Sequence, residues 1–461
     1  MTSSSKTGQQ QPDQTPPEQQ QPPASEDALI AAIKAASNAP STDPAHVPVD
    51  PSSTTTSASS ALRTLFTHPF GVSWRATLVK APRLVPLEVL RYTCPEGPFP
   101  FKWSLKSPRG KHEIPLVIWV PRPEDLLIKG DDVVGISEAV VSKLPVVIDF
   151  HGGGFVLGSC LEQAPSCAQF CREFSAVVIS VDYRMGPIDK FPTAIWDGED
   201  VLKAVLDAES HAGRALREAV KTRMEEGWQK WAKVQDKKEK KDEKAKRPNP
   251  PSRSSTISTL PTVQASDILD PSRIAISGFS SGGNLALNLG LDIKQPDLRD
   301  PWPSMFPPEH QFRIPLLLFY PSLDARQLPS QRNRPANMPP SSPFWTAVDD
   351  ILLPSYLPRQ QTEHPRASPG LANAGRSLHP KAKVLLVLPE FDNLAEQAET
   401  WVKHVYDAGR GSDLEVVKFA GMKHGWTQFP VSWLSEAERT ARAAAFRRAI
   451  DFVREAWTKD F

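Results

Sequence analysis

The fold of this chain is decided by the stretch Gly278-Phe279-Ser280-Ser281-Gly282-Gly283. It follows an apolar run at 273–277 and precedes a helix-compatible run at 284–290. A G-x-S-x-G pattern between a strand and a helix predicts a tight turn, because its glycines let the backbone turn sharply while the serine hydroxyl points out of the chain. The sequence therefore predicts Ser280 to be a catalytic nucleophile.

A five-residue pattern can arise by chance in a chain with 24 glycines among 461 residues, so its neighbours decide its meaning. A second motif, His151-Gly-Gly-Gly154, directly follows the apolar run 145–150. A glycine run at the end of a strand can point bare backbone N–H groups at an oxyanion. Both motifs indicate the same reaction type, and the predicted oxyanion donors are the amides of Gly153, Gly154 and Ser281.

Apolar runs of strand length recur along the chain, and helix-compatible segments separate many of them. They lie at 116–120, 146–150, 176–181, 274–277, 314–320, 384–388 and 414–419. This alternation predicts an α/β fold with a mostly parallel sheet, helices on both faces, and a site at the carboxyl ends of the strands. Four candidate polar residues lie just past such runs: His151, Ser280, Asp392 and His424.

A serine nucleophile needs a base to accept its proton and a carboxylate to hold that base in the right tautomer. His424 lies on a glycine-flanked loop, Gly421-Met-Lys-His-Gly-Trp426, directly after a strand near the end of the series. His404 falls inside the helical pattern 395–408 and is expected to serve the surface or packing. We therefore predict His424 to be the base.

The acid has three candidates. Asp392 follows the strand 384–388 by four residues and precedes His424 by 32. Glu390 comes earlier on the same turn, whereas Glu396 is expected to begin the next helix, where a carboxylate favours the helix dipole. Asp392 is the preferred acid, and the order serine, aspartate, histidine along the chain is that of α/β-hydrolases.

Together these motifs resemble the hormone-sensitive-lipase-like family of α/β-hydrolase esterases, which carry HGGG, then V-D-Y-R-L-A-P-E, then G-D-S-A-G-G. The corresponding stretches here are 151–154, Val181-Asp-Tyr-Arg-Met-Gly-Pro187 and 278–283. The likeness continues through Tyr320-Pro-Ser-Leu-Asp324, Ala367-Ser-Pro369, Phe391-Asp-Asn-Leu394 and His424-Gly-Trp426. It covers about residues 115–455, apart from an insertion at 208–262.

The resemblance implies an α/β-hydrolase fold with Ser280 as nucleophile, Asp392 as acid and His424 as base. It implies the same three oxyanion amides, those of Gly153, Gly154 and Ser281. It also implies that the segment 325–372, together with residues before about 110, caps an acyl pocket.

Three positions depart from the family pattern without removing a catalytic group. Phe279 replaces the usual acidic residue before the serine, Ile188 replaces the glutamate of A-P-E, and Ser281 replaces alanine. Phe279 cannot supply the hydrogen bonds of an acidic residue, so the substrate preference of relatives does not carry over to this chain.

The expected domain organisation is a single catalytic domain at 61–461 behind a tail. Residues 1–60 are rich in Gln, Pro and Ser, which predicts disorder. The segment 325–372 is rich in proline and contains a helix-like run at 344–353, so it is expected to form a helical cap, with a surface insertion as the alternative.

The insertion 208–262 has two halves. Apolar residues at helical spacing in the first half predict an amphipathic helix that packs on the domain: Leu216, Val220, Met224, Trp228 and Trp231. The run 236–247 mixes seven Lys/Arg with four Asp/Glu. Because the signs alternate, this run predicts a solvated helix extension or flexible loop rather than a nuclear-localisation signal or membrane patch.

Composition limits the partners. The net charge of +1 gives no field that favours nucleic acid or an anionic membrane. No apolar run approaches the ~18 residues of a transmembrane helix, and the first residues lack the apolar core of a signal peptide, so a cytoplasmic location is expected. Four cysteines without a C-x-x-C pair suit buried, reduced thiols, and neither a metal nor another cofactor is expected.

The leading hypothesis is a carboxylic ester hydrolase that acts on small apolar acyl esters through an acyl-serine intermediate. An amidase or deacetylase could use the same site, because His424 would protonate either leaving group. A receptor that binds ligands without hydrolysis is the alternative outside catalysis, and such proteins usually lose the base or the nucleophile. The oligomeric state stays open.

Overall fold

A computed structural model describes residues 86–90, 94–126, 143–245, 264–293, 301–340 and 343–458. Side chains are not described at 238–245, 343–345 and 347–349. The predicted tail, 1–60, lies outside the described residues.

The described residues form an eight-stranded sheet in the order β1-β2-β4-β3-β5-β6-β7-β8. Its strands are β1 Phe101–Lys106, β2 Glu113–Trp119, β3 Leu144–Phe150, β4 Val177–Val181, β5 Leu269–Phe279, β6 Ile314–Phe319, β7 Ala382–Phe391 and β8 Leu414–Lys423. β2 pairs antiparallel with β1 and β4, and every other pairing is parallel. The mostly parallel sheet predicted from the apolar runs is therefore confirmed.

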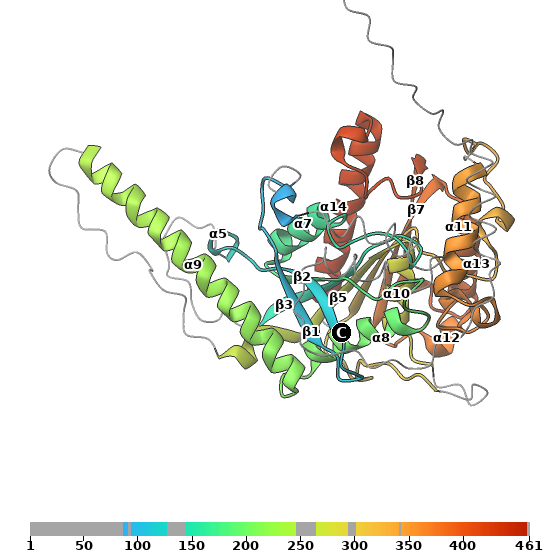
Figure 1. Cartoon of the computed structure of the whole chain (residues 1–461), viewed down its shortest axis with the longest axis horizontal. Helices are drawn as coiled ribbons and strands as arrows, with labels where there is room; N and C mark the ends of the chain where they lie inside the picture. The colour runs from blue at the N-terminus through green and yellow to red at the C-terminus, as the bar shows by residue number, and fades with distance from the viewer. Residues whose placement is uncertain are drawn as a thin grey trace, which may run out of the picture.

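Helices cover both faces of the sheet (Figure 1). One face carries α7 Ala164–Phe174 and α14 Glu436–Thr458, and the other carries α8 Thr193–Leu206, α10 Ser281–Leu289 and α13 Ala395–Asp407. Side chains alternate between the faces along each strand, so Val147 joins the core under α7 and α14 while Ile148 joins the core on the opposite face. Strands buried on both faces explain why they appear in the sequence as continuous apolar runs.

Strand β1 was not predicted. It alternates large apolar residues with Lys102, Ser104 and Lys106, and it lies at the edge of the sheet, half exposed. An edge strand with one polar face lacks the continuous apolar run of the buried strands, so the sequence did not predict it.

The predicted amphipathic helix is present as α9, His211–Ala245. Leu216, Val220, Met224 and Trp228 are buried, while Trp231 is half buried. The buried Arg217 guanidinium donates to the carbonyls of Ala204 and Val205 and so ties α9 to the end of α8. The charged run continues the helix as far as Ala245, and the last turns of α9 project away from the sheet (Figure 1).

Two further predictions from composition concern membranes and thiols. Of the helices in the described ranges, none has both the length and the apolarity needed to cross a bilayer. Cys94, Cys160, Cys167 and Cys171 are all buried thiols.

Strand β3 carries a fully buried carboxyl group, Asp149, two residues before the glycine motif. Ser180 Oγ donates to its Oδ2 at 3.1 Å, whereas Oδ1 has no hydrogen-bond partner within the described structure. Burial raises the pKa of Asp149 to about 6, and the nearby hydroxyls of Ser277 and Ser180 limit that rise. The folded protein therefore keeps the proton on this carboxyl up to a higher pH than the unfolded chain does.

We expect Asp149→Asn to gain stability relative to the wild type as pH rises. The folded pKa exceeds the unfolded value, so the wild-type contribution is fully present below about pH 4, falls as pH passes through about 6, and is lost above that. The free energy of unfolding of the variant relative to wild type should rise by up to about 3 kcal/mol between pH 4 and pH 8. Urea unfolding across this range measures it.

The matched control is Asp407→Asn, which changes an exposed aspartate at the end of α13. Its stability relative to wild type should stay nearly constant over the same range. A relative stability of Asp149→Asn that is independent of pH would contradict a raised pKa of Asp149 in the native state.

Candidate active site

Ser280 lies between β5 and α10 with a strained backbone, φ +54° and ψ −114°. A non-glycine residue with this conformation costs free energy and persists only where its surroundings hold it. Its N–H donates to Phe319 O at 2.9 Å, and its carbonyl accepts from Ser322 N at 3.0 Å and from Asn284 N at 3.2 Å. These contacts keep the turn sharp and leave the hydroxyl clear of the backbone.

The glycines of the turn allow a close approach to β3. A Cβ atom at Gly282 would lie 2.1 Å from Phe150 O and 2.5 Å from His151 O. A Cβ atom at Gly278 would lie 2.0 Å from Gly282 O. The start of α10 therefore packs directly against the end of β3, which brings the glycine motif beside Ser280.

The side chain of His424 lies within hydrogen-bond distance of both Ser280 and Asp392, which were predicted separately. His424 Nε2 is 3.0 Å from Ser280 Oγ, and His424 Nδ1 is 2.8 Å from Asp392 Oδ2. The second carboxyl oxygen of Asp392 accepts from Leu394 N at 2.8 Å, and Asp392 is 1% exposed. A carboxylate that accepts from Nδ1–H leaves Nε2 free to accept the serine proton.

The other candidates for the acid and the base make different contacts. Glu390 is exposed, and its carboxylate accepts from Gly421 N at 2.6 Å. Glu396 lies in the first turn of α13, as expected, and accepts from Asn333 Nδ2 at 2.9 Å. His404 is exposed near the end of the same helix. None of the three contacts Ser280 or His424 through a hydrogen bond in the described structure.

The glycine motif forms a loop with two residues at positive φ, Gly153 at +116° and Gly154 at +62°. Tyr183 Oη donates to His151 O at 2.9 Å, and the two rings stack 4.3 Å apart, which fixes the start of the loop. Within the described structure, the amides of Gly153, Gly154 and Ser281 donate to no protein acceptor. These are the three amides that the sequence nominated as oxyanion donors.

A buried tyrosine, for which the sequence predicted no role, contacts His424. The Tyr320 ring meets the His424 ring edge-on at 4.9 Å, and its hydroxyl bonds to Thr427 Oγ1. Burial raises the pKa of Tyr320 well above its usual value, so the phenol stays neutral. Tyr320 belongs to a family motif, but nothing in its spacing along the chain reveals its contact with His424.

Part of the predicted cap lies against the glycine loop. Helix α11, Pro343–Tyr356, belongs to the segment 325–372. A Cβ atom at Gly154 would lie 3.0 Å from Leu353 Cδ2, and the rings of Tyr356 and Phe155 stack 4.8 Å apart. The predicted role of this segment, covering an acyl pocket, stays a prediction.

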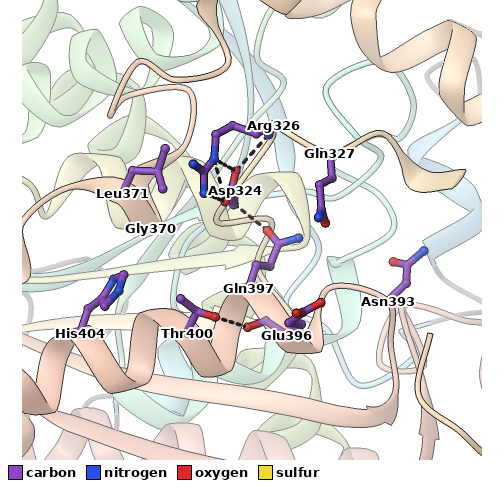
Figure 2. A pocket seen from close by; sticks show the side chains of 10 residues that line it. All are labelled: Asp324, Arg326, Gln327, Gly370, Leu371, Asn393, Glu396, Gln397, Thr400 and His404. Atoms are coloured by element: carbon purple, nitrogen blue, oxygen red, sulfur yellow. Dashed lines mark hydrogen bonds and ion pairs between the residues drawn. The ribbon is translucent and has the colours of Figure 1, made fainter. Parts of the chain in front are cut away.

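A polar cavity of about 320 Å³ lies between α13 and the loop after β6, and Figure 2 shows the side chains that line it. Gln397 Oε1 accepts from Leu323 N and Asp324 N, both at 2.6 Å, and so joins this loop to α13. The cavity is lined by Asp324, Arg326, Gln327, Gly370, Leu371, Asn393, Glu396, Gln397, Thr400 and His404. Ser280, Asp392 and His424 are not among the residues that line this cavity, and its polar walls do not suit an apolar acyl group.

The family profile that matches this chain is described as the alpha/beta hydrolase fold, and it matches residues 147–428. This range holds the glycine motif, Ser280, Asp392 and His424, and it spans more than half of the chain. The chain belongs to this family. Its resemblance to the hormone-sensitive-lipase-like esterases, drawn from the motifs, is thereby confirmed.

Several named relatives are esterases. Carboxylesterase NlhH of Mycobacterium tuberculosis is 25% identical over 318 residues, which cover 68% of this chain and 76% of that protein. Probable carboxylesterase 8 of Arabidopsis thaliana is 28% identical over 161 residues, so this chain spans only 35% of its length. A solved esterase from Pyrobaculum calidifontis covers 82% of this chain and 93% of its own at 21% identity, with a TM-score of 0.48. The family and the named relatives support the predicted hydrolase enzyme.

Proposed function

We propose that this protein is a carboxylic ester hydrolase that acts on small esters with an apolar acyl group. Ser280 is the nucleophile, His424 the general base and Asp392 the acid that orients it. The observation that carries the proposal is the continuous hydrogen-bonded series from Ser280 Oγ through His424 to Asp392, at 3.0 and 2.8 Å. The carboxylesterase names of its relatives support the same activity.

The reaction begins when Ser280 Oγ attacks the ester carbonyl carbon while His424 Nε2 takes the hydroxyl proton. The carbonyl π electrons move to oxygen, and the amides of Gly153, Gly154 and Ser281 stabilise that oxyanion. The intermediate then expels the alkoxide, which takes the proton from His424 and leaves as an alcohol. This leaves an acyl group on Ser280.

Water completes the turnover. His424 Nε2 takes a proton from the water as its oxygen attacks the acyl carbon, and the second oxyanion occupies the same amides. Collapse of this intermediate breaks the bond to Ser280 Oγ, which recovers its proton from His424. The product is a carboxylic acid. The Asp392 carboxylate stabilises the imidazolium in both halves of the reaction.

The acyl group is proposed to lie beside α11. Leu353 of α11 lies next to Gly154, and Tyr356 of the same helix stacks on Phe155, the residue after Gly154. An ester carbonyl bound at the amides of Gly153 and Gly154 would place its acyl chain near this apolar surface. Apolar acyl chains are therefore favoured over charged ones.

Two measurements test the proposal. We expect wild type to react with a fluorophosphonate probe and to hydrolyse p-nitrophenyl esters in a panel from C2 to C12, whereas Ser280→Ala should lose both activities. His404→Ala, which changes an exposed histidine outside the cluster, is the matched control and should keep both. Labelling of Ser280→Ala would rule out the assigned nucleophile, and ligand binding without turnover would favour a receptor.

A further inference from the structure

Gln428 lies four residues after His424, and its side chain reaches out of the loop that carries the proposed base. The loop is closed by Gln428 N, which donates to Gly425 O at 2.9 Å. Tyr320 Oη donates to Gln428 Oε1 at 3.3 Å, so the side-chain amide contacts the same tyrosine that lies against the His424 ring.

The same amide also contacts the glycine loop. A Cβ atom at Gly152 would lie 3.1 Å from Gln428 Oε1 and 3.2 Å from Gln428 Nε2, so the amide group lies against the Gly152 backbone. Gln428 Nε2 donates to Glu162 Oε2 at 3.4 Å, over a separation of 266 residues in the chain. Gln428 therefore contacts the glycine motif at Gly152 and the segment that follows it at Glu162.

Glu162 anchors the far side of this contact. Its Oε1 accepts from Ser159 N at 3.2 Å, at the point where the chain leaves the glycine loop for α7. The sequence predicted no role for Glu162 or Gln428. Their contact joins two segments that are adjacent only in the folded protein.

We propose that Gln428 is a positioning residue that couples the His424 loop to the oxyanion loop through Glu162. This inference rests on the proposed function, because it assigns the two loops to the base and to the oxyanion donors. The amide suits the position because it donates to a carboxylate and accepts from a phenol at the same time. A misplaced oxyanion donor weakens binding of the transition state more than binding of the substrate, so the coupling acts on kcat.

The experiment exchanges the two polar groups. Gln428→Glu places a second carboxylate beside Glu162, and the repulsion should separate the loops. We expect kcat for a short p-nitrophenyl ester to fall about tenfold with KM unchanged within about twofold. The double variant Glu162→Gln with Gln428→Glu restores an amide next to a carboxylate, and its kcat should return to within about threefold of wild type.

Two further variants separate positioning from folding. Gln428→Met keeps the length of the side chain without its hydrogen bonds and should also lower kcat, with an unchanged melting temperature. Gln229→Glu, at an exposed site on α9, makes the same chemical change far along the chain and should leave kcat unaltered.

The outcomes against the inference are distinct. Wild-type kcat in both Gln428→Glu and Gln428→Met would overturn the coupling, and so would a loss of kcat that the double variant fails to recover. A wild-type protein that neither labels nor turns over would instead reject the proposed function, and the inference would fall with it. A normal wild type with unaffected variants rejects the inference alone.

Discussion

Asp392→Asn is expected to lower kcat about 10⁴-fold while the protein stays folded. In the wild type, Asp392 Oδ2 accepts from His424 Nδ1 at 2.8 Å and Oδ1 accepts from Leu394 N at 2.8 Å. Both oxygens act as acceptors, so only one orientation of an asparagine amide can keep the Leu394 bond. That orientation turns an NH₂ group toward Nδ1 and favours the tautomer with its proton on Nε2. His424 could then no longer accept the serine proton.

The measurement is kcat for p-nitrophenyl acetate, with the circular dichroism spectrum and melting temperature as checks on folding. Glu390→Gln and Glu396→Gln are the matched controls, because both carboxylates were candidates for the same role and both face other partners. Each control should stay within about threefold of wild type. A large loss of kcat in either control, or a near-normal kcat in Asp392→Asn, would mean that Asp392 is not the acid that orients His424.

The sequence predicts residues that lie together in the fold because parallel strands end at one edge of a sheet. Ser280 follows β5, Asp392 follows β7 and His424 follows β8. The strands β5 to β8 are parallel and consecutive in the sheet, so their carboxyl ends bring the three residues to one region. Spacing along the chain distinguishes Asp392 from Glu390 less well as the acid, because the side chains at two positions along one turn can point in different directions. Side-chain direction at the end of β7 is a tertiary property, and spacing does not determine it.

The residues that the sequence missed share one physical cause. Tyr320, Glu162 and Gln428 make contacts between segments that are distant in the chain, and spacing along the chain reveals none of these contacts. Strand β1 was missed for a different reason, because its polar face removes the apolar signal. Local pattern therefore predicts strands that are buried on both sides and the residues that follow them, whereas pairwise contacts require the fold.

The strained serine connects stability to the proposed chemistry. Ser280 keeps φ +54° because Phe319, Ser322 and the start of α10 hold the turn from both sides. The same packing presses Gly282 against the end of β3, and β3 leads directly into the glycine loop. The geometry of the proposed nucleophile and that of the proposed oxyanion donors thus depend on one close contact between two backbones.

Gly282→Ala should therefore damage stability and activity together. The new Cβ atom would lie 2.1 Å from Phe150 O and 2.5 Å from His151 O, and both are backbone atoms that cannot rotate away. Either α10 or the end of β3 must shift. We expect a loss of about 2 kcal/mol or more in the free energy of unfolding. We also expect kcat to fall at least about 100-fold, because the shift separates Ser280 from the amides of Gly153 and Gly154.

Gly227→Ala is the matched control for the same chemical change. Gly227 lies within α9, and an added Cβ atom would meet nothing within 4 Å. Alanine favours a helix over glycine by roughly 1 kcal/mol, so this variant should unfold at higher urea concentration with unchanged kcat. Urea unfolding and p-nitrophenyl acetate turnover compare the two variants directly. Gly282→Ala with wild-type stability and turnover would mean that the contact between α10 and β3 yields without cost, and that the turn at Ser280 does not depend on it.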